Sequence, residues 1–314
     1  QLLIFAANVC LARYIAVYYA QIGLSRQLMG LLLFVMPIAS FCGGLFWSAV
    51  VDRTSDYKRT LAGTSVAGVL AVFAYLAPAV QQCFPLLVAV TALHGFLAAP
   101  SGPIVDALCL KVLEESSATD EDYGDQRLWS AVGWGGMALL AGWLVDVFGY
   151  RSIFFVFAAL VAVNVGIILR WMPGAPAAAP AGQSAPPRGA PPGSAQTWLG
   201  ALRSFEVAWL LLNLTVYGAL MALLENFLNV FLLQDFVGTP TVLLGASTAV
   251  MCAFEIPVFK YVGRFWGGGG STRRIVAVLV AAELLLAVRC VLYALLPRAR
   301  PWLVLLVEPL HGVT

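Results

Sequence analysis

Charged residues are scarce in this chain. Asp, Glu, Lys and Arg make up 11% of the 314 residues, whereas soluble domains carry roughly 25%. The hydrophobic share is 61% and the mean hydropathy is +0.88. This balance excludes an ordinary water-soluble domain. The net charge is only +2, so no nucleic-acid partner is expected.

Residues that build disulfide frameworks, metal sites and catalytic centres are also few. The six cysteines stand singly in apolar segments without a CxxC pair, and we interpret them as small, inert core residues. No nucleophile triad, metal cluster or phosphate-binding loop is recognisable, so we expect no enzyme, metal or cofactor. The chain starts without Met and ends in an apolar run, and we expect it to be a fragment at both ends.

Long apolar runs recur along the chain instead. They are about 18 residues or longer, which is enough to cross a hydrocarbon core of about 30 Å. Lipid offers no partner to backbone polar groups, so each run is predicted to be a helix. We count ten spans: 2–20, 28–51, 61–79, 84–110, 127–148, 152–172, 205–233, 242–262, 275–296 and 301 onward.

A proline-rich segment divides these spans into six and four. Residues 173–197 hold seven of the 17 prolines and almost no large apolar side chain, which is typical of a disordered linker. We therefore predict an all-α membrane protein with an N-terminal six-helix bundle over 1–172. A disordered Pro/Ala/Gly-rich linker follows over 173–204, and a truncated C-terminal bundle over 205–314.

The distribution of positive charge predicts an orientation. Twelve of the 18 Lys and Arg residues lie in the loops after the second, fourth, sixth and eighth spans, and four lie in the opposite loops. Because positive charge favours the cytoplasmic side, the N-terminus and the central linker are predicted to be cytoplasmic.

Ionisable residues inside the spans are the candidate functional groups. Each costs about 2.5 to 3.5 kcal/mol at the centre of a membrane helix, so each is expected to have a function and a partner. They are Arg13, Asp106, Glu225, Glu255, Glu283, Arg289, Glu308 and His311.

The fourth and fifth spans hold the clearest pair. Two prolines and a glycine precede Asp106, and a short loop makes these spans antiparallel neighbours, so Arg127 is its expected partner. Solute binding and a structural ion pair both remain open for them. Trp134 lies two turns beyond Arg127 and fits either ring stacking or interfacial anchoring. The nearby glycines favour close helix packing: Gly133, Gly135 and Gly136.

Four other residues are expected to couple proton movement to solute transport: Glu225, Arg289, Glu308 and His311. Glu225 and Arg289 are placed to pair across the seventh and ninth spans. Glu308 and His311 lie one turn apart, an arrangement that suits a proton relay or a structural contact. Arg13 lies too far from either end of the first span to reach the surface, and is expected to face a cavity and to help bind the substrate.

These motifs resemble the lactose-permease-like branch of the major facilitator superfamily, which includes oligosaccharide and nucleoside proton symporters. The strongest matches are YGDQRLWSAVGWGG in the fifth span and GPIVDALCLKV in the fourth. The resemblance implies that Asp106 and Arg127 bind the solute and that Trp134 stacks on it. It also matches Arg289 and His311 to conserved family positions in the ninth and tenth spans, and Glu225 to an acidic position in the seventh.

The loop SAVVDRTSDYKR resembles the superfamily's gating motif, with its charges at Asp52, Arg53, Lys58 and Arg59. Ser55 replaces the second glycine of that motif. Residues 142–151, GWLVDVFGYR, repeat the same spacing of Gly, Asp, Gly and Arg on the other side. In this resemblance Ala246 and Thr314 stand at the positions of the family's sugar-binding and proton-carrying glutamates, so galactoside specificity is not implied.

The resemblance implies a major facilitator fold of two six-helix bundles, with about ten of the twelve helices in this chain. Its function is then secondary active transport by alternating access, as proton-coupled symport of a small hydroxylated solute, a sugar or nucleoside. The alternatives are a non-transporting membrane receptor or scaffold and an uncoupled uniporter. The expected partners are the solute, a proton and the lipid bilayer.

Overall fold

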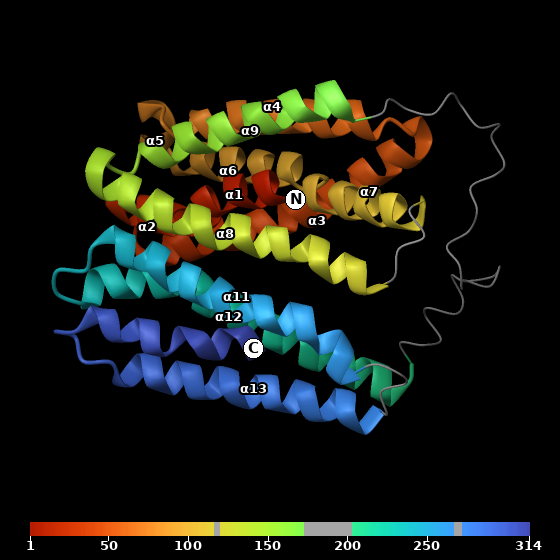
Figure 1. The fold of residues 1–314 in the computed structure, drawn as a ribbon. Helices are drawn as coiled ribbons and strands as arrows, with labels where there is room; N and C mark the ends of the chain where they lie inside the picture. The colour runs from red at the N-terminus through yellow and green to blue at the C-terminus, as the bar shows by residue number, and fades with distance from the viewer. Residues whose placement is uncertain (116–119, 173–202, 267–271) are drawn as a thin grey trace.

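The computed structural model describes residues 1–115, 120–172, 203–266 and 272–314 (Figure 1). All regular elements in these ranges are helices, which confirms the predicted all-α class. The first bundle contains α1 (Leu2–Ala12), α2 (Ile15–Gln21), α3 (Arg26–Thr54), α4 (Tyr57–Ala74), α5 (Pro78–Gln82), α6 (Phe84–Ala98), α7 (Ser101–Glu115), α8 (Asp120–Phe148) and α9 (Ser152–Trp171). The second contains α11 (Phe205–Asp235), α12 (Thr241–Trp266), α13 (Thr272–Leu295) and the 3₁₀ helices η1 (Pro301–Leu306) and η2 (Glu308–Val313).

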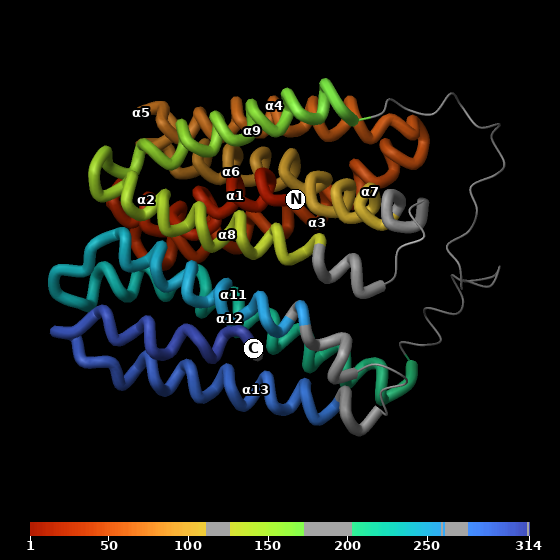
Figure 2. Tube along the Cα trace, in the orientation of Figure 1, coloured from red at the N-terminus to blue at the C-terminus, as the bar shows by residue number. Residues whose placement is uncertain are grey.

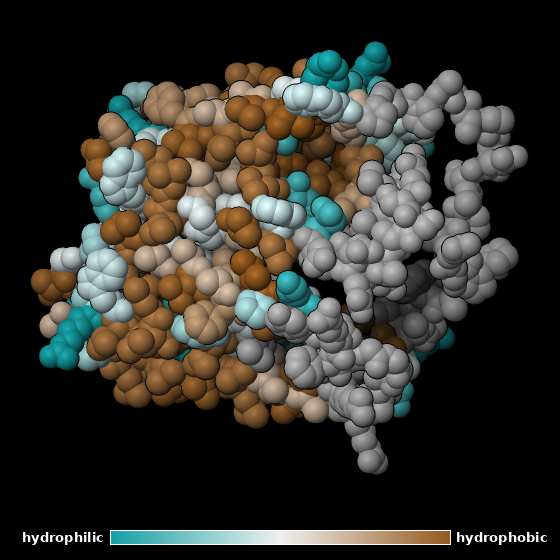
Figure 3. Space-filling model, in the orientation of Figure 1, coloured by the Kyte–Doolittle hydropathy of each residue, from teal (hydrophilic) through white to brown (hydrophobic). Residues whose placement is uncertain are grey.

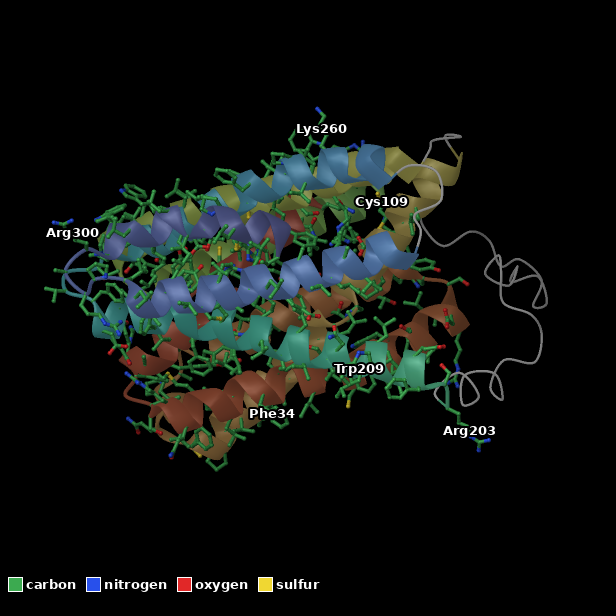
Figure 4. The ribbon with its side chains drawn as sticks, turned by 90° about the horizontal axis from the view of Figure 1, so that it is seen from below. Phe34, Cys109, Arg203, Trp209, Lys260 and Arg300 are labelled. Atoms are coloured by element: carbon green, nitrogen blue, oxygen red, sulfur yellow. The ribbon has the colours of Figure 1, made fainter. Side chains whose placement is uncertain are left out.

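The two bundles lie side by side, and α8 packs against α12 between them (Figure 1). The predicted linker lies almost wholly outside the described residues, which resume just before α11. We call the end of the molecule where α9 ends and α11 begins the linker end, and the other the far end. Arg203 lies at the linker end and Arg300 at the far end (Figure 4).

The outer surface is suited to lipid. Within the described ranges, eight helical segments are long and apolar enough to cross a membrane. Large apolar side chains such as Phe34 and Trp209 are exposed, and hydrophobic residues cover much of the face seen in Figure 3. The protein is an integral, multi-pass membrane protein. Of the six cysteines only Cys10 and Cys252 are buried, so the prediction that all were core residues was wrong.

The first predicted span is broken at its charged residue. Helix α1 ends at Ala12 and α2 begins at Ile15, because the amide of Tyr14 turns to the carbonyl of Leu11 instead of continuing the α-helical pattern. The carbonyl of Arg13 accepts a 2.7 Å hydrogen bond from the Asn229 side chain of α11. The break thus gives the second bundle a backbone contact deep in the first.

The fourth predicted span is also broken, between α6 and α7. Pro100 has no N–H to donate to the carbonyl of Phe96, four residues earlier. The indole of Trp47 donates to that carbonyl instead, at 3.0 Å. Gly43 permits this close approach of α3, since a Cβ there would lie 2.5 Å from the same oxygen. The prolines predicted to loosen this span therefore end one helix and begin another.

The predicted start of the fifth span, at residue 127, was wrong. Residues 121–126, which the sequence placed outside that span, form the first turns of α8, so Arg127 lies about two turns inside the helix. The segment after residue 301 is helical as predicted, in the 3₁₀ form. Close packing is confirmed at Gly133, which meets the backbone of Leu2, and at Gly135, which meets Cys252. It is not found at Gly136, which has open space beside it.

Candidate functional site

A cavity of 210 Å³ lies between the two bundles, near the middle of the helices. The first residue of the chain also lies at this depth, as Figure 2 shows. Both bundles contribute polar groups to the cavity. Its lining consists of Phe5, Arg13, Arg127, Ser130, Ala131, Trp134, Glu225, Met251, Cys252, Glu255 and His311.

Arg13 bridges the two bundles at the inner end of this cavity. Its side chain is 7% exposed and lies 3.9 Å from the Glu225 carboxylate. It also donates hydrogen bonds to the backbone carbonyl of Glu225 at 3.3 Å and to the sulfur of Met251 at 3.2 Å. The helix break at Arg13 brings the local backbone close to α11, and this positions the Arg13 side chain for these contacts. The structure thus places Arg13 in a cavity, as the sequence predicts.

Glu225 also meets His311. The His311 Nε2 atom lies 3.8 Å from the Glu225 carboxylate, an ion pair only when the imidazole is protonated. Glu225 is half-buried, while His311 is buried. An arginine, a carboxylate and a histidine therefore lie together where the break after α1, helix α11 and helix η2 meet.

The structure brings Arg127 and Asp106 together, as predicted. A guanidinium nitrogen of Arg127 lies 3.7 Å from the Asp106 carboxylate, and both side chains are partly exposed. Only Arg127 lines the cavity. Asp106 therefore orients Arg127 from behind and does not itself reach the cavity in this conformation.

Trp134 forms the aromatic wall of the cavity on α8. Its ring meets Phe5 edge to face, with centroids 6.2 Å apart. Below it, Ala131, Met251 and Cys252 form a small buried apolar cluster. The indole lies at mid-helix beside this cluster, so it is a cavity residue rather than an interfacial anchor.

Arg289 and Glu308 form a second, deeper group. Both side chains are 2% exposed, and their charged atoms lie 3.8 Å apart. The Glu308 carboxylate accepts hydrogen bonds from Ser247 at 2.6 Å and Tyr293 at 3.1 Å. Arg289 also donates to Tyr293 at 3.2 Å and to Thr314 at 2.7 Å. This charge pair is almost fully provided with partners.

A space of 10 Å³ connects the two groups. Its lining includes Arg13 and Glu225 on one side and Ser247, Arg289 and Glu308 on the other. That volume is about the minimum needed to hold one water molecule. The ion pair of Arg289 and Glu308 is thus separated from the main cavity by a space that holds roughly one water molecule.

Two predicted pairings were wrong. Glu225 pairs with Arg13 instead of Arg289, and Arg289 pairs with Glu308. Glu308 and His311, one turn apart in sequence, form no hydrogen bond or ion pair with each other: Glu308 pairs with Arg289, and His311 lies beside Glu225. A relay between these two side chains is not formed here.

Sequence reasoning gave Glu255 no firm role and did not identify Ser130 or Tyr293. Glu255 faces the cavity from α12. Ser130 follows Arg127 by three residues and Tyr293 follows Arg289 by four, so both lie on the same helical faces as a predicted site residue. This spacing is the sequence signal that could have identified both residues.

The predicted gating loop lies at the linker end, between α3 and α4. Lys58 donates to the backbone carbonyl of Met172 at the end of α9, at 3.0 Å. Arg59 pairs with Asp56 at 3.4 Å on the surface. Asp52 borders a separate cavity with Trp47 and Tyr57, while Arg53 is exposed. Ser55, at the motif's second glycine, has φ = 52°, a left-handed conformation that favours glycine.

The comparisons with known proteins agree with this architecture. The sequence profile of the MFS_1 like family matches residues 1–314. The chain belongs to this family. It is a major facilitator transporter and not an enzyme.

Two relatives of this transporter are informative. A maltose permease of Geobacillus stearothermophilus is 27% identical over 312 residues, which cover 99% of this chain and 73% of that protein. The crystal structure of the nucleoside transporter NupG superposes with a TM-score of 0.72 at 19% identity, and covers 99% of this chain and 76% of that one. A D323A mutant of NupG gives the same TM-score of 0.72 at 17% identity. These structural matches confirm the predicted major facilitator fold.

Proposed function

We propose that this transporter is a proton-coupled symporter of a small hydroxylated solute, a sugar or a nucleoside, and works by alternating access. The supporting observation is the cavity between the bundles, which has carboxylates and guanidinium groups beside an aromatic wall. Hydroxyl groups donate to carboxylates and accept from guanidinium groups. The apolar face of a sugar or base ring fits against the indole of Trp134.

The charges of the cavity favour a neutral solute. Arg13 and Arg127 supply two positive groups, and Glu225 and Glu255 supply two carboxylates. A solute with net charge would upset this balance in a medium of low dielectric constant, where an unpaired charge costs several kcal/mol or more. This chain resembles a maltose permease and a nucleoside transporter, and maltose and nucleosides belong to the same class of neutral polyhydroxylated solutes.

Coupling is assigned to the charged groups behind the cavity. Glu225 contacts both Arg13 and His311, so a proton taken up there removes the negative charge that holds the two bundles together. Glu308 lies across the 10 Å³ space and is the second carboxylate that a proton reaches. Arg289 stays positive throughout, because its guanidinium does not deprotonate in proteins.

The orientation belongs to the same proposal. The linker and the linker end of the molecule are assigned to the cytoplasmic side, where positive loops are favoured, while the first residue lies at mid-depth (Figure 2). Hydrogen bonds and an ion pair join the bundles at mid-helix and at the far end. The conformation is therefore assigned as closed to the outside and open toward the cytoplasm.

Uptake into proteoliposomes tests coupling and solute class together. With an imposed pH gradient, we expect accumulation of at least one labelled sugar or nucleoside and collapse of accumulation when a protonophore is added. Exchange of solute without accumulation would show that the protein is a uniporter and not a symporter. Binding of solute without exchange would show that it is a receptor.

Two matched substitutions test the site itself. Arg127→Gln removes a group in the cavity, and we expect solute affinity to fall by roughly tenfold or more, since hydrogen bonds to charged groups contribute about 1.5 to 3 kcal/mol. Asp106 does not line the cavity and acts through neighbouring groups such as Arg127, so the effect of Asp106→Asn is expected to be smaller. Equal affinity of the wild type and both variants would show that the solute binds elsewhere.

A further inference from the structure

The far end of the molecule is closed by a carboxylate of one bundle on a helix of the other. Asp146, near the end of α8, accepts a 2.7 Å hydrogen bond from the backbone N–H of Thr241 and another of 2.7 Å from that of Val242. These are the first residues of α12. The first N–H groups of a helix have no partner within it and lie at the positive end of its dipole, so a carboxylate binds them well.

Glycines bring the same two helices into backbone contact beside Asp146. A Cβ on Gly142 would lie 2.7 Å from the carbonyl oxygen of Thr241. On the opposite side of the interface, a Cβ on Gly245 of α12 would clash with the carbonyl of Ala138. A hydrogen bond of 3.2 Å between the hydroxyls of Tyr150 and Thr241 completes the contact.

The contact around Asp146 lies at the far end of the interface. Towards the linker end α8 and α12 border the cavity at Arg127 and Glu255. Because the Asp146 contact lies at one end, it can form and break as the bundles rock. Its residues also fall in the 142–151 motif, which repeats the spacing of the gating loop and which the solute site does not use.

We propose that Asp146 is a positioning residue for transport: its clasp on the first turn of α12 sets the balance between the conformations closed and open at the far end. Opening there requires the two hydrogen bonds to break, and closing reforms them. The clasp involves no solute and no proton. The inference rests on the proposed alternating access, but it does not depend on which solute moves or on whether protons drive it.

Distances between spin labels across the far end test the clasp. Labels are attached at Arg151→Cys and Val237→Cys, both exposed, in the full-length protein with its native cysteines replaced by serine. For Asp146→Ala we expect a longer distance to appear, with the open-to-closed ratio raised roughly three- to tenfold, the usual effect of losing a capping carboxylate. Gly245→Ala is expected to shift the ratio in the same direction by steric clash.

The matched controls lie on the same surfaces. Asp235 is an exposed carboxylate at the far end without a hydrogen bond or ion pair to any described residue, and Gly136 on α8 has open space beside it. Asp235→Ala and Gly136→Ala are expected to keep the wild-type distances. A second label pair within the first bundle, at Gln82→Cys and Arg151→Cys, reports misfolding, because its distance must stay constant in every variant.

The outcomes separate the clasp from the transport proposal. A wild-type distance distribution in Asp146→Ala, with the second pair unchanged, would overturn the role of Asp146. An equal shift in the Asp235→Ala control would overturn it as well. The labels report without solute or pH gradient, so a failure to find a transported solute leaves this measurement intact, and its failure leaves uptake to be judged separately.

Discussion

Neutralising Glu308 is the most informative perturbation of the buried charges. The Glu308 side chain is 2% exposed, and its carboxylate lies 3.8 Å from the Arg289 guanidinium. In Glu308→Gln the side chain keeps its size but leaves the guanidinium without a counter-charge. Arg289 cannot shed its proton, and no aqueous surface is within reach of a side chain 2% exposed.

The expected loss of stability follows from that burial. Breaking one partner of a buried ion pair costs about 3 to 5 kcal/mol, because the other charge stays uncompensated. Arg289→Gln is expected to cost less, since the carboxyl of Glu308 can take up a proton and become neutral. The double variant removes both charges and is expected to recover much of the loss.

Thermal unfolding of purified protein in detergent measures this order. A change of 1 kcal/mol shifts the melting temperature by about 2 to 4 °C in domains of 150 to 250 residues, so Glu308→Gln is expected to melt roughly 10 °C below wild type. If Glu308→Gln melts at the wild-type temperature, or if the double variant is the least stable of the three, the two residues are not a stabilising ion pair and the coupling assignment loses its basis.

Three further predictions concern single contacts. Trp134→Ala is expected to weaken solute binding about tenfold, the usual contribution of a ring contact, whereas Trp143→Ala on the exposed face of α8 leaves it unchanged; equal losses in a binding titration would contradict the aromatic wall. Ser55→Gly relieves a left-handed conformation and is expected to stabilise the protein by about 1 kcal/mol, seen as a higher melting temperature. Asn229→Ala leaves the carbonyl of Arg13 without its side-chain donor and is expected to cost about 1 to 3 kcal/mol in the same assay; an unchanged melting temperature would show that the helix break does not need this bond.

The location of the spans was predictable because it depends on local composition. Runs of apolar residues long enough to cross lipid appear in the sequence wherever α3, α9 and α11 lie. The breaks within the spans were harder to predict. The missing N–H of Pro100 indicated one of them. The break at Arg13 has no proline or glycine and depends on Asn229, 216 positions away in the chain.

The candidate site was predictable as a set of residues and less so as a set of pairs. Asp106 with Arg127 was found because a short connection makes neighbouring spans antiparallel, which leaves few possible partners. Glu225 and Arg289 lie on α11 and α13, whose rotation about their axes no local signal fixes, since these two helices are apolar on nearly every side. Glu308 lies on the short helix η2. The predicted pairing there was wrong for that reason.

The sequence by itself determined that this protein is helical, crosses a membrane many times and carries a few charges that must turn inward. Those properties follow from the cost of placing polar groups in lipid, which acts on each segment separately. Only the tertiary structure decided which carboxylate meets which cation, that Asp146 caps a helix of the other bundle, and which end of the interface is closed. Each of these depends on the register and rotation of helices distant in sequence, and packing between whole helices sets both.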